Sequence, residues 1–237
     1  MKLLDTVNGH WYEAFDNVLP SVTTILDATT PKPFLTDWML KQGYKADVSL
    51  RNAINTGNVV HDVIMRLLRG EEIDIRNESY YEVDGYNLTL TVEMRKAIES
   101  GVVWFEQNPV NILATEIKLA HDKYEFAGTC DIVFQKDDKT YLVDTKTSNQ
   151  LDENVNLQLT AYKILWDELY PDNKIDKIAV LHCKKAWMNG KDPCAKFTTK
   201  KFDKNAWLLA VERFKHMKKK PIYKYNTTRT YKLGMYL

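Results

Sequence analysis

Two aspartates and a lysine stand in short apolar segments near the middle of the chain. Asp131 precedes the residues Ile-Val-Phe, and Asp144 follows Tyr-Leu-Val and is separated from Lys146 by one residue. A carboxylate within an apolar strand is costly unless it is paired or binds a metal ion. These three side chains are therefore candidates for a divalent-metal site.

The polar segment between the two aspartates predicts how they face each other. If residues 137–138 form a two-residue hairpin turn, Asp131 lies directly opposite Asp144, with Cβ atoms roughly 4.5–5.5 Å apart. Alternation along the second strand puts Leu142, Asp144 and Lys146 on one face. Like charges directly opposite destabilise a strand pair, so the aspartates need a compensating cation. A longer turn would shift the pairing and turn the carboxylates to different faces.

A histidine lies on a strongly helical segment upstream of these strands. The pattern over residues 49–69 predicts a helix that ends at Gly70. One stripe of this helix carries Gly57, His61, Ile64 and Leu68. His61 thus points with apolar residues, which is typical of a buried core histidine. With two candidate aspartates elsewhere in the chain, metal ligation by His61 is the alternative.

The composition is that of an ordinary soluble globular protein and suits one large domain. Of 237 residues, 44% are hydrophobic and 27% are charged, and the net charge is +1. No apolar run reaches the roughly 18 residues that a membrane helix needs, and the start of the chain does not resemble a signal peptide. Its three cysteines lack a Cys-x-x-Cys spacing, so we expect neither a zinc nor an iron–sulfur site. We expect a protein of the reducing cytoplasm with no membrane partner.

Positive charge is concentrated at the C-terminal end. Eight of the 33 basic residues and no acidic residue lie in the last 25 positions, which leaves 25 basic against 32 acidic residues in the first 212. Cations interleaved with aromatic rings suit a single nucleic-acid strand, because cations meet phosphates while rings stack on bases. The basic cluster that we predict to bind nucleic acid is Lys218, Lys219 and Lys220; a solvated terminus without a partner is the alternative.

The other elements follow from turn and capping signals. A hairpin is predicted around residues 8–9, Ser21 is expected to cap a short helix, and Asp203 is expected to cap a helix to about residue 217. Helices are predicted over residues 34–42, 92–108 and 152–169, and strands over residues 178–182 and 195–202. The segment 71–90 carries six acidic residues and is expected to be irregular.

Five motif blocks occur in a fixed order along the chain: Gly57-x-x-x-His61, Glu116, Gly128-Thr-x-Asp131, Asp144-x-Lys146-Thr-Ser148 and Gln158-x-x-x-Tyr162. In this order they resemble the RecB-type branch of the PD-(D/E)xK nucleases. The segments 19–26 and 33–38 are similar to those of the mitochondrial genome-maintenance exonucleases and their bacteriophage relatives. The resemblance covers roughly residues 19–170, about two-thirds of the chain.

This resemblance implies an α/β fold of the restriction-endonuclease-like, PD-(D/E)xK type, in which helices flank a central mixed sheet behind a helical N-terminal section. We expect one nuclease domain over residues 1–237. Its mainly helical N-terminal section covers residues 19–107, and its catalytic sheet core covers residues 111–202 and includes the helix 152–169. A C-terminal helix and the basic tail occupy residues 203–237.

The resemblance also implies roles for individual residues. Its metal ligands fall on His61, Asp131, Asp144 and the Thr145 carbonyl. Lys146 corresponds to the residue that orients the attacking water, and Glu116 to an acidic position that binds metal indirectly or holds Lys146. The substrate strand is expected to meet Thr147, Ser148, Gln158 and Tyr162. Hard oxygen ligands favour Mg²⁺ or Mn²⁺, and an imidazole shifts the preference somewhat toward Mn²⁺.

The function that the resemblance implies is a metal-dependent exonuclease acting on single-stranded DNA with free ends. The expected setting is replication, recombination or repair, in a phage-encoded protein in the cytoplasm of a bacterial host. A recombinase or a single-strand-binding protein is a candidate partner. Two alternatives stay open: an endonuclease specific for flaps or junctions, and a non-cleaving nucleic-acid-binding accessory protein on the same scaffold.

Overall fold

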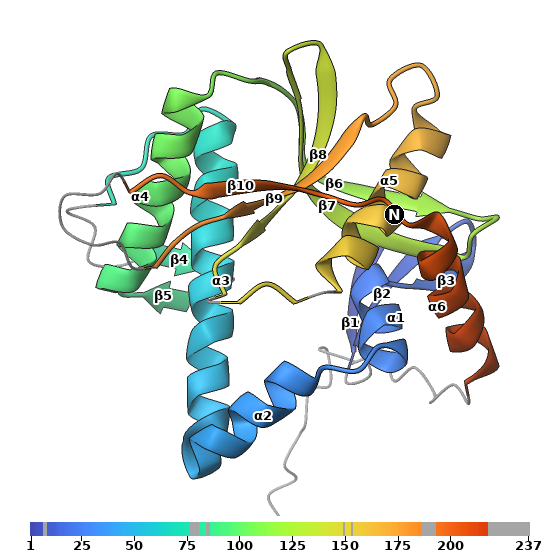
Figure 1. The fold of residues 1–237 in the computed structure, drawn as a ribbon, viewed down its shortest axis with the longest axis horizontal. Coiled ribbons are helices and arrows are strands. Elements are labelled where there is room, and N and C mark those ends of the chain that lie inside the picture. Colours follow the sequence, from blue (N-terminus) through green and yellow to red (C-terminus); the bar gives the residue numbers. More distant parts are fainter. Residues whose placement is uncertain are drawn as a thin grey trace, which may run out of the picture.

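The fold is built on a five-stranded sheet that crosses the middle of the molecule (Figure 1). The structure is a computed structural model, and it describes residues 1–6, 9–75, 81–83, 86–148, 150–152, 154–185 and 193–217. The strands of the sheet lie in the order β10-β9-β8-β7-β6. Their bounds are β6 Asn111–His121, β7 Phe126–Lys136, β8 Lys139–Lys146, β9 Lys177–His182 and β10 Lys196–Lys200. Strands β8 and β9 are parallel and the other pairs are antiparallel, which confirms the expected mixed sheet.

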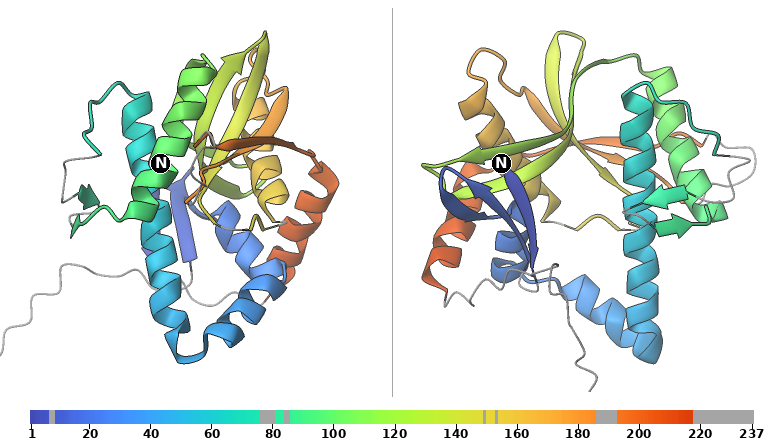
Figure 2. Two further views of the ribbon diagram at one scale, coloured as in Figure 1. Left: turned by 60° about the vertical axis from the view of Figure 1, so that its left-hand side comes forward. Right: turned by 180° about the vertical axis from the view of Figure 1, so that it is seen from behind.

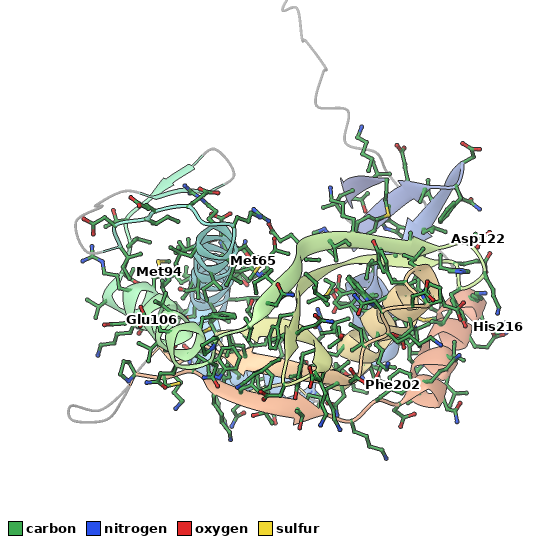
Figure 3. All side chains as sticks on the ribbon, turned by 90° about the horizontal axis from the view of Figure 1, so that it is seen from above. Met65, Met94, Glu106, Asp122, Phe202 and His216 are labelled. Carbon is green, nitrogen blue, oxygen red and sulfur yellow. The ribbon has the colours of Figure 1, made fainter. Side chains whose placement is uncertain are left out.

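Helices cover both faces of this sheet. Because parallel neighbours cannot be joined by a tight turn, β8 returns to β9 through helix α5 (Val155–Leu169), which covers one face together with α1 (Val22–Thr29) and α6 (Lys204–His216). The other face carries α3 (Ala46–Leu68) and α4 (Val92–Gln107). In Figure 3, Met65 on α3 and Met94 on α4 lie at one end of the molecule, and His216 on α6 lies at the other.

Two apolar cores result, one on each face. The core beneath α1, α5 and α6 includes the fully buried Phe126, Leu142 and Trp207. The core beneath α3 and α4 includes Ile132, Phe134 and Val143, which are also fully buried. A sheet that is apolar on both faces needs such cover on both sides, so β7 and β8 are held between two packed layers.

The hairpin between β7 and β8 has the predicted turn. Lys136 pairs with Lys139 across Asp137 and Asp138, whose φ angles are 51° and 57°. Positive φ at both central residues is the mark of a type I′ turn, which matches the right-handed twist of the strands. The register is therefore the one from which Asp131 and Asp144 were expected to meet.

A second, three-stranded sheet lies beside the outer end of β6 and β7 (Figure 2). It consists of β1 (Lys2–Thr6), β2 (Gly9–Ala14) and β3 (Asn17–Pro20). The pairing of β1 with β2 confirms the predicted N-terminal hairpin, but Gly9, which was expected in the turn, begins β2 and pairs with Thr6; residues 7–8 lie outside the described residues.

The predicted helices occur with small differences at their ends. The Ser21 side chain accepts the Thr24 N–H at the start of α1, and Asp203 accepts the Ala206 N–H at the start of α6, so both predicted N-caps are confirmed. Helix α2 covers Pro33–Gln42, and the short 3₁₀ helix η1 (Gly43–Lys45) joins it to α3, which begins three residues earlier than predicted. Helix α5 begins at Val155 rather than at residue 152.

The segment 71–90 is less irregular than expected. Its described part contains two short antiparallel strands, β4 (Tyr81–Val83) and β5 (Tyr86–Leu88). Three-residue strands leave too little periodicity for a sequence pattern to detect. Within the described part of the chain, no helix is long and apolar enough to cross a membrane.

Candidate active site

Asp144 and Lys146 lie on the face of β8 that α5 covers. Asp144 is 2% exposed, and its Oδ2 forms an ion pair with the Lys146 Nζ at 2.7 Å. Burial raises the pKa of Asp144 to about 6 against the opposing effect of Lys146. Burial lowers the pKa of Lys146, but the carboxylates of Asp144 and Asp131 outweigh it and raise that pKa. Lys146 is therefore cationic at neutral pH.

Asp131 lies where the β7–β8 ladder ends. The register runs to Ile132 and Val143, one pair short of the two aspartates, and the Asp131 Oδ2 instead accepts the Thr145 N–H at 2.8 Å. The expected direct pairing of Asp131 with Asp144 is thus replaced by a side-chain contact to the next residue of β8. This contact satisfies a backbone donor that the ladder would otherwise leave unpaired.

Strand β7 also changes face at this residue. Phe126 and Cys130 belong to the core beneath α5, whereas Ile132 and Phe134 belong to the core beneath α3 and α4. Uninterrupted alternation would keep all four on one face. The irregularity at Asp131 therefore turns this carboxylate toward α3.

His61, on α3, meets Asp131 from that side. Its Nδ1 lies 3.1 Å from the Thr145 Oγ1 and 3.4 Å from the Asp131 Oδ2, and its Nε2 lies 3.1 Å from the Glu116 Oε1. Burial lowers the pKa of His61, but Asp131 and Glu116 more than offset this and raise it to about 10. With His61 protonated, Nδ1–H donates to the Thr145 hydroxyl, which in turn donates to Asp131 at 3.0 Å.

Glu116 is held by two cations. His61 binds one of its oxygens and the Arg69 Nη2 binds the other. The hydrogen bond from His61, reinforced by Arg69, lowers the pKa of Glu116 to about 2 although partial burial opposes the shift. The resemblance left open whether Glu116 acts through a metal ion or holds Lys146; here it contacts His61, and Lys146 contacts Asp144 and Gln158.

Gln158 and Tyr162 approach the same lysine from α5. The Gln158 Oε1 lies 3.3 Å from the Lys146 Nζ, and the Gln158 Nε2 donates to the Tyr162 hydroxyl at 3.3 Å. Tyr162 is only 4% exposed and lies in the core beside Gly128. It therefore supports Gln158, while contact of Gln158 with a substrate stays a prediction.

Thr147 and Ser148 continue β8 beyond the site. Ser148 is exposed, and its carbonyl lies 2.6 Å from the Nε2 of His182, at the end of β9. Thr147 lies close to Gly57 on α3. Both residues border Lys146, but the predicted basic cluster, Lys218, Lys219 and Lys220, lies outside the described residues.

The sequence did not point to two residues of this site, Arg69 and His182. Arg69 is at the C-terminal end of α3, where a basic residue is expected simply to complement the helix dipole. Its spacing of eight residues from His61, about two helical turns, is the one signal that places both on a similar side of the helix. Its partner on β6 depends on packing between distant segments, which no local pattern carries.

The family follows from a match that contains all these residues. Residues 36–220 match the family model of the PD-(D/E)XK nuclease superfamily, well over half of the chain. The chain belongs to the PD-(D/E)XK nuclease superfamily. It is accordingly a nuclease, a hydrolase that binds DNA, and nucleases of this superfamily generally use divalent metal ions such as Mg²⁺. The predicted resemblance is confirmed at the level of the superfamily.

Two further comparisons add nothing to this assignment. No curated protein matches the chain. A solved structure titled "Crystal structure of SSO0001" is 13% identical, with a TM-score of 0.32, over 51% of this chain and 56% of that chain. The match therefore spans little more than half the length of that protein, and a similarity at this level carries no argument about the PD-(D/E)XK site.

The donor set of this PD-(D/E)XK nuclease fits a divalent ion in chemical type. Within the described ranges no group of three His, Cys, Asp or Glu side chains forms a ready-made metal site, because the carboxylates are turned to His61, Arg69, Thr145 and Lys146. However, the buried Oδ2 of Asp144 has no hydrogen-bond partner. Its charge is met instead by the Lys146 ammonium group, and a buried carboxylate oxygen that pairs with a cation in this way is also suited to a metal ion. The residues that would hold the ion are His61, Asp131 and Asp144.

Replacing Gly128 with alanine tests the packing that supports the site. An added Cβ would lie 2.4 Å from the Tyr162 Cε1, so Tyr162 would have to move. We expect a loss of about 1–3 kcal/mol in the free energy of unfolding, measured by urea titration. At Gly57 an added Cβ would lie 3.6 Å from the Thr147 Oγ1, an ordinary contact. Gly57→Ala should therefore stabilise α3, by up to about 1 kcal/mol; equal stability of the two variants would contradict this packing.

Proposed function

We propose that this nuclease is a metal-dependent exonuclease of the RecB-type branch, related to the mitochondrial genome-maintenance exonucleases and their bacteriophage relatives, and that it degrades single-stranded DNA from free ends. The observation that supports this most is that the His61–Asp131 pair, which faces α3, and the Asp144–Lys146 pair, which faces α5, lie at the same end of the β7–β8 ladder. We further propose a role in replication, recombination or repair, with a recombinase or single-strand-binding protein as partner.

The proposed ligands of the metal ion are His61, Asp131, Asp144 and the Thr145 carbonyl. Oxygen ligands favour Mg²⁺ or Mn²⁺, and the imidazole adds some preference for Mn²⁺. When bound, the ion makes a water molecule a better nucleophile and neutralises charge on the scissile phosphate. Asp131 and Asp144 come from the adjacent strands β7 and β8. His61 compensates the charge of Asp131, and Lys146 compensates that of Asp144.

Lys146 is proposed as the catalytic cation. Its ammonium group is held between the Asp144 carboxylate and the Gln158 amide oxygen, and its side chain is 32% exposed. The ammonium group of Lys146 is therefore held in one orientation, and its side chain is still accessible to a substrate. Such a preorganised charge stabilises the negative charge that develops on the phosphate in the transition state.

The preference for free ends is proposed from the arrangement of the helices. Helix α2 and the first half of α3 extend away from the sheet, next to the half of α3 that carries His61 (Figures 1 and 2). Leu40 on α2 and Tyr44 on η1, which joins α2 to α3, are 76% and 91% exposed. Exposed apolar and aromatic groups suit the bases of a single strand that enters by its end. Thr147, Ser148 and Gln158 are proposed to meet the same strand beside Lys146.

The decisive experiment is cleavage of a linear single-stranded DNA that carries a label at either end. We expect Mg²⁺- or Mn²⁺-dependent products that EDTA abolishes, and the difference between the two labels gives the polarity. Circular single strands should resist digestion; their cleavage would establish the endonuclease alternative instead. The Lys146→Ala variant, purified in parallel, excludes a contaminating nuclease. DNA binding without cleavage by any metal would favour the accessory-protein alternative.

Removing the basic tail tests its proposed contact with DNA. Deletion of residues 218–237 removes six basic residues. The tail follows α6, which packs against α1 and α5 in the layer that Lys146 faces. We expect weaker DNA binding and a salt dependence flatter by about 0.7 in log K against log [salt] for each phosphate that the tail no longer neutralises. Fluorescence anisotropy at several salt concentrations measures this, and an unchanged slope would exclude the proposed role of the tail.

A further inference from the structure

Glu116 has a backbone conformation that is unusual inside a strand. Its φ is 48°, in the left-handed region, although β6 continues on both sides of it. The flanking pairs Thr115–Ile132 and Ile117–Cys130 are kept, so Glu116 lies at the position opposite Asp131. Such a conformation costs of order 1 kcal/mol or more in a residue with a side chain, and it persists where the surroundings hold it. The contacts that hold Glu116 in this conformation are therefore of interest.

Arg69 binds the Glu116 carboxylate and also the side chain of the preceding residue, Thr115. Its Nη2 donates to the Glu116 Oε2, and its Nε donates to the Thr115 Oγ1 at 3.1 Å. A planar guanidinium that donates hydrogen bonds to two successive residues fixes both the position and the direction of the carboxylate. The second oxygen of Glu116 is then left to accept from the His61 Nε2.

Arg69 and His61 are carried by the same helix. Arg69 is the C-cap residue of α3, its N–H bonds to the Met65 and Arg66 carbonyls, and the chain turns away at Gly70 with a φ of 86°. Both ends of the contact chain His61–Glu116–Arg69 are thus anchored on α3, and its middle is anchored on β6. Small displacements of the Glu116 side chain are opposed from both sides.

The consequence is a fixed orientation of the imidazole. With Nε2 bonded to Glu116, Nδ1 faces Asp131 and Thr145. We propose that Arg69 is a positioning residue, which through Glu116 holds His61 so that its Nδ1 is presented to Asp131 and to the metal ion. This inference rests on the proposed function. A carboxylate that receives the second N–H of a metal-binding histidine orients the ring, and its removal typically weakens metal binding about 10–100-fold.

The test is the affinity for Mn²⁺, measured by electron paramagnetic resonance of the free ion in the absence of DNA. We expect Arg69→Gln to weaken Mn²⁺ binding about 10–100-fold. Arg69→Lys should recover part of the affinity, because an ammonium group can pair with Glu116 but lacks the fork that also reaches Thr115. The matched control is Arg66→Gln, one turn earlier, where the arginine pairs with Glu71 instead; its affinity should equal that of the wild type.

A double variant separates action through Glu116 from a direct effect. If Arg69 acts through Glu116, the variant carrying Arg69→Gln and Glu116→Gln should bind Mn²⁺ no more weakly than Glu116→Gln alone. Urea unfolding in EDTA should also show an energetic coupling between residues 69 and 116, and none between residues 66 and 116.

Three results would overturn the inference: an Arg69→Gln affinity equal to that of the wild type, additive effects in the double variant, or no coupling in EDTA. Wild-type protein that binds no Mn²⁺ would overturn the proposed metal site and this inference together. That outcome is recognised from the wild type alone, so the two failures are distinguishable.

Discussion

The Asp144→Asn variant is expected to lose DNA cleavage by on the order of 10³-fold while keeping its affinity for DNA. The substitution preserves shape but removes the negative charge that faces Lys146 and the proposed metal ion. Asp144 is almost fully buried, so water cannot replace the missing charge. Cleavage is measured by single-turnover kinetics with Mg²⁺, and binding by anisotropy in EDTA.

A matched control lies in the same hairpin. Asp138 is exposed at the turn and has a φ of 57°, a conformation that asparagine tolerates as well as aspartate does. Asp138→Asn should therefore cleave like the wild type. Wild-type activity in Asp144→Asn, with the protein folded, would remove Asp144 from the ligand set and leave the metal site without its most buried oxygen.

The Phe126→Ala variant is expected to lose about 3–5 kcal/mol of stability, the largest effect on folding that we predict. Phe126 is fully buried and meets Trp207 edge-on, with ring centroids 5.0 Å apart. Removing the ring leaves a cavity between β7 and α6 in addition to losing its transfer free energy. Domains of this kind have a total stability of about 5–15 kcal/mol, so a large share would be lost. Urea unfolding of the metal-free protein measures the change.

Phe15 offers the corresponding control on the surface. It is 60% exposed, between β2 and β3, and its φ of 52° is equally strained for phenylalanine and alanine. We expect Phe15→Ala to change the stability by less than about 0.5 kcal/mol. Similar losses at the two positions would show that the core beneath α5 is looser than its burial indicates.

The site combines elements that are far apart in the chain. His61 comes from the helical N-terminal section, Asp131 and Asp144 from a hairpin, and Gln158 from the crossover helix that the parallel pairing of β8 with β9 requires. Each carboxylate has a protein cation beside it. The charges of the site are thus balanced within the protein, and a metal ion that binds His61 through Nδ1 has to replace the proton on that nitrogen.

Local signals in the sequence predicted much of this arrangement. The two-residue turn at Asp137 and Asp138 determined the register of the central hairpin, because a type I′ turn pairs the residues on either side of it and so allows only one register of the flanking strands. The N-caps at Ser21 and Asp203 and the stripe that carries His61 depend on neighbouring residues, and the structure has them as predicted. The motif blocks led to the superfamily that the family model confirms.

What the sequence by itself determined is therefore most of the element types, the central register and which residues to consider as candidates for the site. Only the tertiary structure decided that β7 changes face at Asp131, that the ladder stops one pair early, and that Glu116 is held between His61 and Arg69. The reason is physical: turns, caps and periodicity depend on residues a few positions apart. These three features depend on how α3 packs across β6, β7 and β8, and that packing is set by contacts between segments that are far apart in the chain.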